Sequence, residues 1–229
     1  MKRLWIAFFC VALVTIQLNA QKKTTLKTQK EKISYIIGTD IGKNLKKQSI
    51  DVNPELLFKG IKDAFAGDKF LLTDQEIQEV MGAFQQEMIA KQSEKMGKVA
   101  AANKKEGEAF LEANKKKDSI ITLPSGLQYK VVVEGTGKIP TVKDTVTTHY
   151  RGTLVDGTEF DNSYKRGEPA TFPVSGVIAG WTEALQHMKS GSKWKLYIPS
   201  NLAYGDRGAG QLIGPGATLI FDIELISVK

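Results

Sequence analysis

The chain has 229 residues, 41% of them hydrophobic, and a formal net charge of +7. This length allows one or two domains, and the apolar content is sufficient for an ordinary packed core. In residues 21–119 lysines are interleaved with acids, and neither arginine nor a stacking pattern of aromatic residues accompanies them. That composition is typical of a solvated helix surface and argues against nucleic acid as a partner.

Residues 1–20 have the composition of a secretory signal peptide. Lys2 and Arg3 precede an apolar run at 4–16, which is too short to span a membrane comfortably. Ala20 supplies the small residue of a cleavage site. We therefore predict export to the periplasm, or association with the outer membrane, with no stable membrane span after cleavage. An uncleaved membrane anchor is the alternative.

The only cysteine, Cys10, lies inside this apolar run. Phe8 and Phe9 precede it where a lipoprotein signal would have small residues, so lipidation is not indicated. After cleavage the chain has no cysteine, which excludes disulfides, thiolate metal sites and cysteine nucleophiles. A chain without a free thiol also suits an oxidising compartment.

Residues 21–119 are predicted to be helical. The first helix, at about 31–47, has a stripe of isoleucines, and its Gly38 and Gly42 lie four residues apart. This spacing either allows close approach of another helix or only weakens the first one. A second helix is expected to begin with Asn53 as N-cap and Pro54 in its first turn, and to end at Gly67.

The third predicted helix is long and becomes more polar along its length. It begins at a capping box, Thr73 to Glu76, and continues to about Lys116, roughly 60 Å at a rise of 1.5 Å per residue. Such a helix is supported by its own ion pairs or stands in solvent as a stalk. Two short helices cannot bury their apolar stripes against it. We therefore expect residues 21–119 to form an intertwined homodimer; a monomeric three-helix cap is the alternative.

Residues 120–229 predict an α+β domain. Runs of alternating apolar and polar residues at 127–133, 193–198 and 218–226 are typical of antiparallel strands. The first run is expected at the edge of the sheet, and in the second Tyr197 is expected on the same side as Lys193 and Lys195. Asp156-Gly157 is a strong hairpin signal, because a tight turn requires residues that tolerate positive φ. One convincing helix begins at Gly180. Several antiparallel strands with one short helix define the α+β class.

Several separate motifs in this half occur in a recognisable order. HYRGTLVDGTEFDNS at 149–163 comes first, and the series continues through Gly180-Trp181 and 202–205 to 217–221. In this order they resemble the FKBP-type peptidyl-prolyl cis-trans isomerases over about residues 125–229. The phrase ISYIIGTDIGKNLKKQ in the first half is similar to the dimerisation domain of the macrophage infectivity potentiator-like and periplasmic FkpA-like members.

This resemblance implies a twisted sheet wrapped around one helix, with an apolar pocket for proline. It implies that Trp181 is the floor of the pocket, that Tyr204 offers its hydroxyl to a substrate carbonyl, and that the backbone N–H of Ile178 binds another. Asp161 would lie at the rim, near the amide that rotates, and Arg166 would pair with it. The remaining walls would be Tyr150, Phe160, Val177, Ile213 and Phe221.

Three departures from the family pattern concern the pocket walls. Ala170 stands where many single-domain members have an aromatic residue, and Ala209 and Gly210 occupy a loop tip. Gly214 replaces a common proline, so we expect a more mobile loop there. These changes affect the expected affinity for macrolide inhibitors more than the expected isomerase activity.

This half lacks the residue arrangements of nucleophilic, metal and nucleotide chemistry, which favours a reaction that has no covalent step. His149 and His187 lie far apart in the sequence, and no nucleophile elbow, metal-ligand cluster or phosphate-binding glycine loop occurs. We expect no metal and no cofactor. Prolyl isomerisation needs neither, because its barrier of about 18–20 kcal/mol comes from amide resonance. A dry apolar pocket weakens that charge-separated resonance, and hydrogen bonds orient the flanking peptide.

We therefore predict three segments: a signal peptide at 1–20, a helical dimerisation domain with a stalk helix at 21–119, and an isomerase domain at 120–229. The predicted function is isomerisation of proline-containing polypeptides in the folding of exported proteins. The alternative is a holdase chaperone that binds unfolded chains in the cleft of a dimer, with isomerisation secondary.

Overall fold

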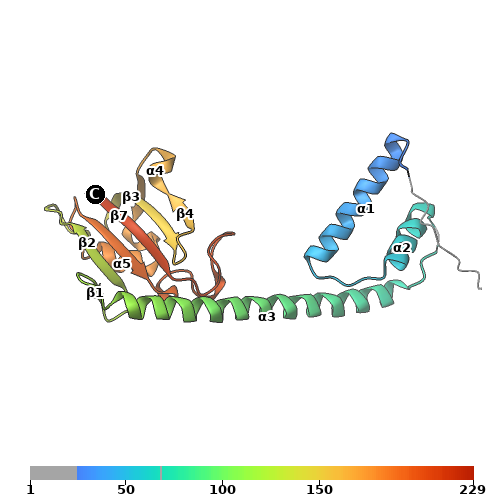
Figure 1. Ribbon diagram of the computed structural model, residues 1–229, viewed down its shortest axis with the longest axis horizontal. Coiled ribbons are helices and arrows are strands. Elements are labelled where there is room, and N and C mark those ends of the chain that lie inside the picture. The colour runs from blue at the N-terminus through green and yellow to red at the C-terminus, as the bar shows by residue number, and fades with distance from the viewer. Residues whose placement is uncertain (1–24, 68) are drawn as a thin grey trace, which may run out of the picture. The chain divides into compact units, whose positions relative to one another are not determined.

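The computed structural model describes residues 25–67 and 69–229, so the predicted signal peptide and Cys10 lie outside the described residues. Contacts divide the chain into a first unit that ends at Thr73 and a second from Asp74 to Lys229 (Figure 1). The helical half predicted at 21–119 thus has two parts: its first two helices form one unit, and its long helix groups with the following sheet. No helix in the described ranges combines the length and apolar character needed to cross a membrane.

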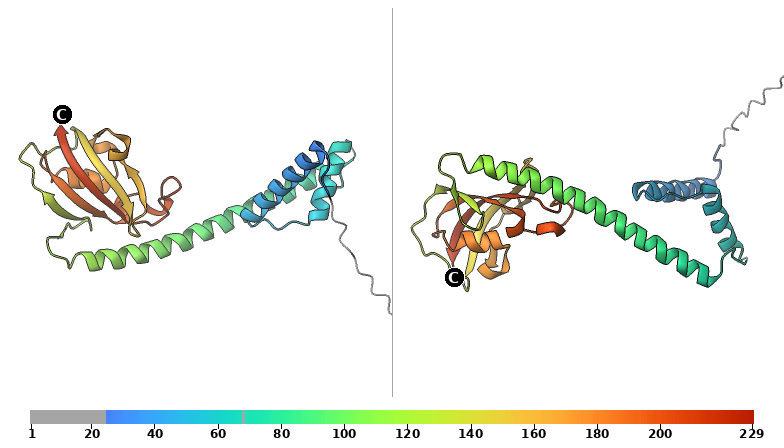
Figure 2. Two further views of the ribbon diagram at one scale, coloured as in Figure 1. Left: turned by 45° about the horizontal axis from the view of Figure 1, so that its top comes forward. Right: turned by 90° about the horizontal axis from the view of Figure 1, so that it is seen from below.

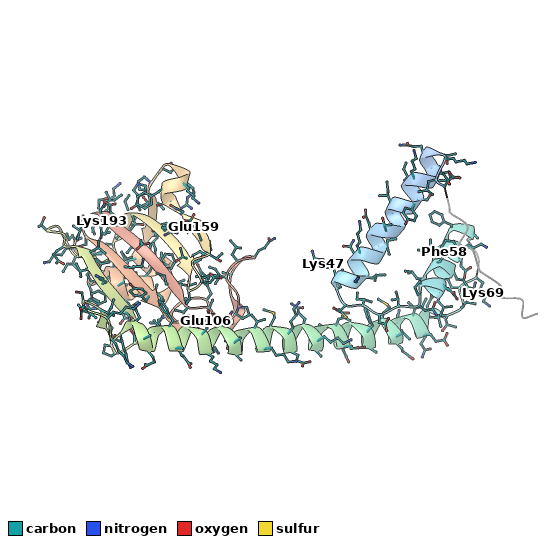
Figure 3. All side chains as sticks on the ribbon, viewed as in Figure 1. Lys47, Phe58, Lys69, Glu106, Glu159 and Lys193 are labelled. Atoms are coloured by element: carbon teal, nitrogen blue, oxygen red, sulfur yellow. The ribbon has the colours of Figure 1, made fainter. Side chains whose placement is uncertain are left out.

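The first unit contains α1 (Gln29–Lys47) and α2 (Pro54–Ala66). Both helices have strong end signals. Thr28 and Glu31 form a capping box at α1. The Asn53 side chain caps α2, as predicted. Gly67 ends α2 in the left-handed conformation, also as predicted. Neither helix has a buried residue, and aromatic side chains such as Phe58 project freely from α2 (Figure 3).

Helix α3 (Asp74–Asn114) has 41 residues, which confirms the predicted long helix. Its three buried residues, Ala100, Gly107 and Asn114, are spaced by seven and therefore lie on one face. They all fall in its C-terminal turns, which run alongside the sheet domain (Figures 1 and 2). The prediction that this helix is supported by its own ion pairs or stands in solvent as a stalk omits the packing of these turns against the sheet domain.

The sheet has seven strands in the order β1-β2-β6-β7-β3-β4, with β5 paired to β3, and every pair is antiparallel. The strands are β1 (Ile121–Thr122), β2 (Gln128–Val133), β3 (Thr145–Leu154), β4 (Glu159–Asn162), β5 (Ala170–Pro173), β6 (Lys193–Ile198) and β7 (Leu219–Val228). The prediction that places β2 at the edge is wrong, because the two-residue strand β1 pairs outside it.

Two short helices accompany the sheet: α4 (Ser163–Arg166) directly follows β4, and α5 (Ala179–Leu185) lies on the concave face (Figures 1 and 2). Four of the seven residues of α5 are buried, and they pack with the inward side chains of β6 and β7. The strand β6 alternates as predicted, except that Tyr197 on the outward face is only 8% exposed. Phe110 of α3 covers it, with ring centroids 5.9 Å apart.

The predicted hairpin at Asp156-Gly157 joins β3 to β4. Gly157 has φ of 87°, a conformation that residues with a side chain rarely adopt. The Asp156 carboxylate accepts a hydrogen bond from the N–H of Thr158 at 2.9 Å, which closes the turn. This hairpin returns the chain so that Phe160 and Asp161 of β4 lie beside β3.

Candidate active site

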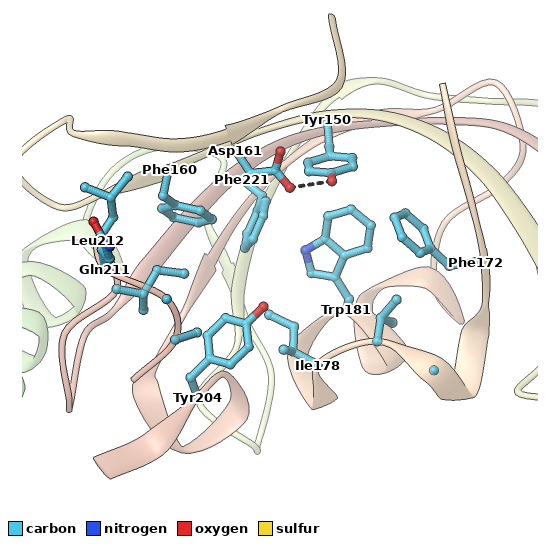
Figure 4. Close-up of a pocket in the computed structure, with 15 residues that line it drawn as sticks. Tyr150, Phe160, Asp161, Phe172, Ile178, Trp181, Tyr204, Gln211, Leu212 and Phe221 are labelled. Atoms are coloured by element: carbon cyan, nitrogen blue, oxygen red, sulfur yellow. Dashed lines mark hydrogen bonds between the residues drawn. The ribbon is translucent and has the colours of Figure 1, made fainter. Parts of the chain in front are cut away.

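A cavity of about 640 Å³ lies between α5, the strands β3, β4, β5 and β7, and the loop that precedes β7 (Figure 4). All nine residues predicted for the site line it: Tyr150, Phe160, Asp161, Val177, Ile178, Trp181, Tyr204, Ile213 and Phe221. They come from six separate stretches of the chain between residues 150 and 221. Asp161 is the one carboxylate among the lining residues, which include no lysine, arginine or histidine, so the cavity is mostly apolar with a single charged group at its edge.

Trp181 is at the centre of an aromatic cluster. The edges or faces of Tyr150, Phe172 and Phe221 meet its indole at interplanar angles of 88°, 89° and 80°, with ring centroids 5.2 to 6.0 Å apart. These T-shaped contacts are a favoured geometry for aromatic rings. They hold the indole rigidly, 4% exposed, at the base of the cavity.

Gly152 allows two of the aromatic walls to meet. A Cβ at this position of β3 would lie 2.5 Å from the Phe160 ring and 2.8 Å from the Phe221 ring. Those two rings pack edge to face, with centroids 5.5 Å apart. A side chain at residue 152 would therefore displace both walls.

Asp161 is held by three neighbours. The Tyr150 hydroxyl donates to Oδ2 of Asp161 at 2.6 Å, and the backbone N–H of Asn162 donates to Oδ1 at 2.8 Å. The Arg166 guanidinium forms an ion pair with the same carboxylate and donates to the Tyr150 hydroxyl at 2.9 Å. The structure therefore contains the Asp161–Arg166 pair that the resemblance implied.

These contacts move two pKa values in opposite directions. Burial raises the pKa of Tyr150, and its hydrogen bond to Asp161 adds to that effect. For Asp161, burial acts to raise the pKa, but the hydrogen bonds from Tyr150 and Arg166 outweigh it and lower the pKa below its ordinary value. At neutral pH the cavity therefore has a neutral phenol beside an ionised carboxylate.

Tyr204 lies opposite this group. It precedes the 3₁₀ turn Gly205–Arg207, it is 40% exposed, and its hydroxyl points into the cavity (Figure 4). Within the described residues this hydroxyl has no hydrogen-bond partner. Ile178 lies at the start of α5, where its carbonyl accepts from the N–H groups of Trp181 and Thr182. Both residues line the cavity, Tyr204 with a polar hydroxyl and Ile178 with an apolar side chain.

His149 is not in the cavity. Its Nδ1 lies 2.9 Å from the Ser163 hydroxyl, which also accepts from the N–H of Tyr150 at 2.8 Å. Its ring stacks on Tyr164. The contacts of His149 thus fix the junction of β3 and α4. In the described ranges no group of three His, Cys, Asp or Glu side chains is arranged to hold a metal ion.

The predicted site residues leave out six residues that line the cavity: Phe172, Gly176, Ala209, Gly210, Gln211 and Leu212. Of these, only Ala209 and Gly210 were noted in the sequence, as the tip of a loop. Phe172 is the most informative of the six. It follows Ala170 by two residues on β5, so both point to the same side of the strand. The aromatic ring that Ala170 does not supply is therefore provided by Phe172, and the alternation of the strand was the signal that could have identified it.

Comparison with known families places two domains on the chain. Residues 30–131 match the family described as a domain amino terminal to FKBP-type peptidyl-prolyl isomerase, and residues 137–226 match FKBP-type peptidyl-prolyl cis-trans isomerase. The chain therefore belongs to the FKBP-type peptidyl-prolyl cis-trans isomerases and is an enzyme of that class.

Individual relatives match almost the whole chain. The outer membrane protein MIP of Legionella longbeachae is 53% identical over 212 residues, which are 93% of this chain and 91% of the relative. The peptidyl-prolyl cis-trans isomerase Mip of Coxiella burnetii is 44% identical over 229 residues, 100% of this chain and 99% of the relative. The crystal structure of FkpA from Escherichia coli superposes with a TM-score of 0.72 at 42% identity, covering 90% of this chain and 99% of that one.

Proposed function

We propose that the nine predicted residues form the catalytic site for isomerisation and that its substrates are proline-containing segments of exported polypeptides. The observation that carries this proposal is their convergence on one apolar cavity with a single ionised group. In the proposed mechanism a proline ring rests on Trp181. The surrounding aromatic rings keep water from the amide, which favours the twisted, less charge-separated state over the planar one.

Asp161 and Tyr204 supply the polar contacts in this mechanism. The ionised carboxylate of Asp161 is held rigidly by its neighbours, so it needs no reorganisation as the amide rotates. The Tyr204 hydroxyl is placed to donate to a peptide carbonyl and so fix the flanking chain. No covalent step and no proton transfer is required.

The test is the rate of cis-to-trans isomerisation of a short proline peptide, measured for the full chain and for Asp161→Leu and Tyr204→Phe. We expect each change to lower kcat/KM by about tenfold or more, because one oriented contact at the reacting group is lost. The same changes should leave the thermal midpoint within a few degrees of wild type. Two variants as fast as the wild type would overturn the assignment of the site.

We also propose that the protein is a homodimer through the first unit. The supporting observation is that α1 and α2 together leave large apolar side chains uncovered, including Ile36, Phe58 and Phe65 at 55%, 69% and 89% exposed. Such surfaces are typical of interaction sites. Sedimentation equilibrium tests this proposal, since a monomer at micromolar concentration would contradict it.

Export to the periplasm or the outer membrane, and an inhibitory affinity for macrolides, are further proposals. Support for export comes from the composition of residues 1–20 and from a relative named as an outer membrane protein. Cell fractionation, with N-terminal sequencing to locate the cleavage site, tests it. The holdase alternative is not favoured, because the matching family and the relatives with a named activity are isomerases.

A further inference from the structure

One wall of the cavity belongs to a loop with little rigidity of its own. Residues 205–216, here called the 205–216 loop, contain five glycines in twelve residues. The tip, Ala209 to Ile213, lines the cavity. Two backbone hydrogen bonds between Ala209 and Ile213 close the tip, and the N–H of Gly216 donates to the Gly205 carbonyl at 2.8 Å across its base. A glycine-rich loop of this kind has many alternative conformations and loses much entropy when it is ordered.

Helix α3 contacts this loop at both ends. Near the start of the loop, Lys104 Nζ lies 2.6 Å from the Asp206 carboxylate. Near its end, the Asn103 side-chain amide donates to the Pro215 carbonyl at 2.8 Å. Neither Asn103 nor Lys104 lines the cavity. The helix therefore holds the ends of a segment whose tip forms a wall.

The contact is close enough to require small residues. A Cβ at Gly107 of α3 would lie 2.1 Å from Thr218 Oγ1, just beyond the loop. A Cβ at Gly216 would lie 2.6 Å from the Ala100 carbonyl oxygen. The buried positions Ala100 and Gly107 thus bring the helix backbone directly against the chain that leads from the loop into β7.

The same helix is fixed to the sheet. The Leu111 carbonyl accepts from the Gln128 side chain at 3.0 Å, and the Asn114 amide donates to the same side chain at 3.0 Å. Phe110 packs on Tyr197 of β6. Helix α3 therefore connects the loop to the rigid part of the domain by a second route, separate from the chain itself.

We propose that Asn103 and Gly107 are positioning residues for the isomerase reaction: through them α3 orders the 205–216 loop, and the ordered loop presents Ile213 to the substrate. Ordering the loop in the free enzyme removes an entropy loss that substrate binding would otherwise bear. Weakening the contact should therefore raise KM more than it lowers kcat. The kinetic readout of this inference rests on the isomerase function, whereas amide exchange of the loop does not.

The main variant is Gly107→Ala in the full chain, and the matched control is Gly97→Ala. Both glycines lie inside α3, and alanine favours a helix interior equally at both, but a Cβ at Gly97 meets nothing within 4 Å. We expect KM to rise about tenfold in Gly107→Ala with kcat changed by less than about twofold, and no change in Gly97→Ala. A second pair compares Asn103→Ala with Lys98→Ala, since Lys98 pairs only with Glu94 on the same helix.

Rescue separates positioning from a general loss of structure. Thr218→Ala removes the hydroxyl that the new Cβ would strike and leaves the Thr218 Cβ, which lies 3.0 Å from it, as a tight but tolerable contact. The double variant Gly107→Ala/Thr218→Ala should therefore bring KM most of the way back to the wild-type value. Hydrogen exchange at the amides of Ala209 and Ile213 should be faster in Gly107→Ala and Asn103→Ala than in either control.

The outcomes divide cleanly. Faster loop exchange with raised KM and rescue by Thr218→Ala supports the proposal. Unchanged exchange and KM in Gly107→Ala would overturn it, and so would equal effects in Gly97→Ala. If the wild type does not isomerise the peptide at all, the proposed function fails, while the exchange comparison still decides whether α3 orders the loop.

Discussion

Helix α5 and the pair α1 and α2 use apolar residues in opposite ways. Helix α5 has seven residues and buries four of them, whereas α1 and α2 have 19 and 13 residues and bury none. The short helix is surrounded by a curved sheet that contacts it over much of its surface. The two longer helices have comparable apolar stripes but nothing in the described chain that covers them.

The difference shows that amphipathic pattern alone does not identify the surface a helix buries. For α5 that surface is in the same domain, so its stability should not depend on concentration. For α1 and α2 our proposal places it in a second copy, so their stability should depend on concentration. The four predictions below test this contrast and the site that α5 supports.

The largest effect is expected from Leu185→Ala in α5. Leu185 is fully buried, and truncation of such a leucine to alanine costs about 2–5 kcal/mol of unfolding free energy. Chemical denaturation of the second unit, Asp74 to Lys229, should show this loss at every protein concentration. A loss that disappears on dilution would mean that the α5 core depends on assembly, and the contrast would fail.

The next effect concerns Phe65→Glu in α2. Phe65 is 89% exposed in the single chain, so the change should cost little in a monomer. In the proposed dimer the change places a charge in an apolar interface, so it should raise the dissociation constant of the dimer by at least about tenfold. Sedimentation measures this. The control is Lys59→Glu, about 120° around α2 from Phe65, which loses only the ion pair with Asp63 on the same helix. Equal sedimentation of the two variants would exclude Phe65 from the interface.

A smaller effect is expected from Arg166→Met. Removing the guanidinium deprives Asp161 of its ion pair, so the carboxyl pKa should rise toward its ordinary value, and kcat/KM should fall by up to about tenfold. Carbon-detected NMR titration of Asp161 and the peptide assay measure the two changes. Lys165→Met removes the same charge one residue away, where the partner is Glu159, and should alter neither quantity.

The smallest effect is the acid dependence of stability. Hydrogen bonds from Lys165 and Arg151 lower the pKa of Glu159 from 4.5 to about 2. A carboxyl with a lowered pKa stabilises the fold fully above its unfolded value, and the contribution is lost as pH falls toward the folded value. The contribution of Glu159 to the thermal midpoint should therefore be constant from pH 8 to 5, and it should be lost between about pH 4.5 and 2. Glu159→Gln removes the titrating carboxyl and should therefore show a smaller decline. The difference should be small, because surface pairs are screened by solvent.

The sequence allowed the prediction of most elements, because their signals are local. The caps at Asn53 and Gly67, the turn at Gly157 and the alternation of β6 and β7 all lie where the pattern predicted them. The errors concern neighbours rather than elements. Strand β2 is not the edge because β1 pairs with it, and Tyr197 is not solvated because Phe110 covers it.

The cavity shows the same division. The nine predicted residues depended on the order and spacing of several motifs, and all of them except Asp161 are bulky apolar or aromatic side chains. Phe172, Gln211 and Leu212 were not predicted, because their place in the cavity depends on how β5 and the 205–216 loop fold over it. Glycine-rich segments carry little local information about direction, since glycine allows many backbone conformations.

The sequence by itself determined the α+β class and the helical first half, because hydrophobic period, caps and turns act over a few residues. Its resemblance to a family, rather than those local signals, implied the nine residues that line the cavity. The tertiary structure alone decided that the last turns of α3 lie against the catalytic domain and contact the loop that lines its pocket. Those contacts join residues more than one hundred positions apart, as between Asn103 and Pro215, and pack Gly107 closely against Thr218. No period within α3 distinguishes a face that rests on such a loop from one that faces water.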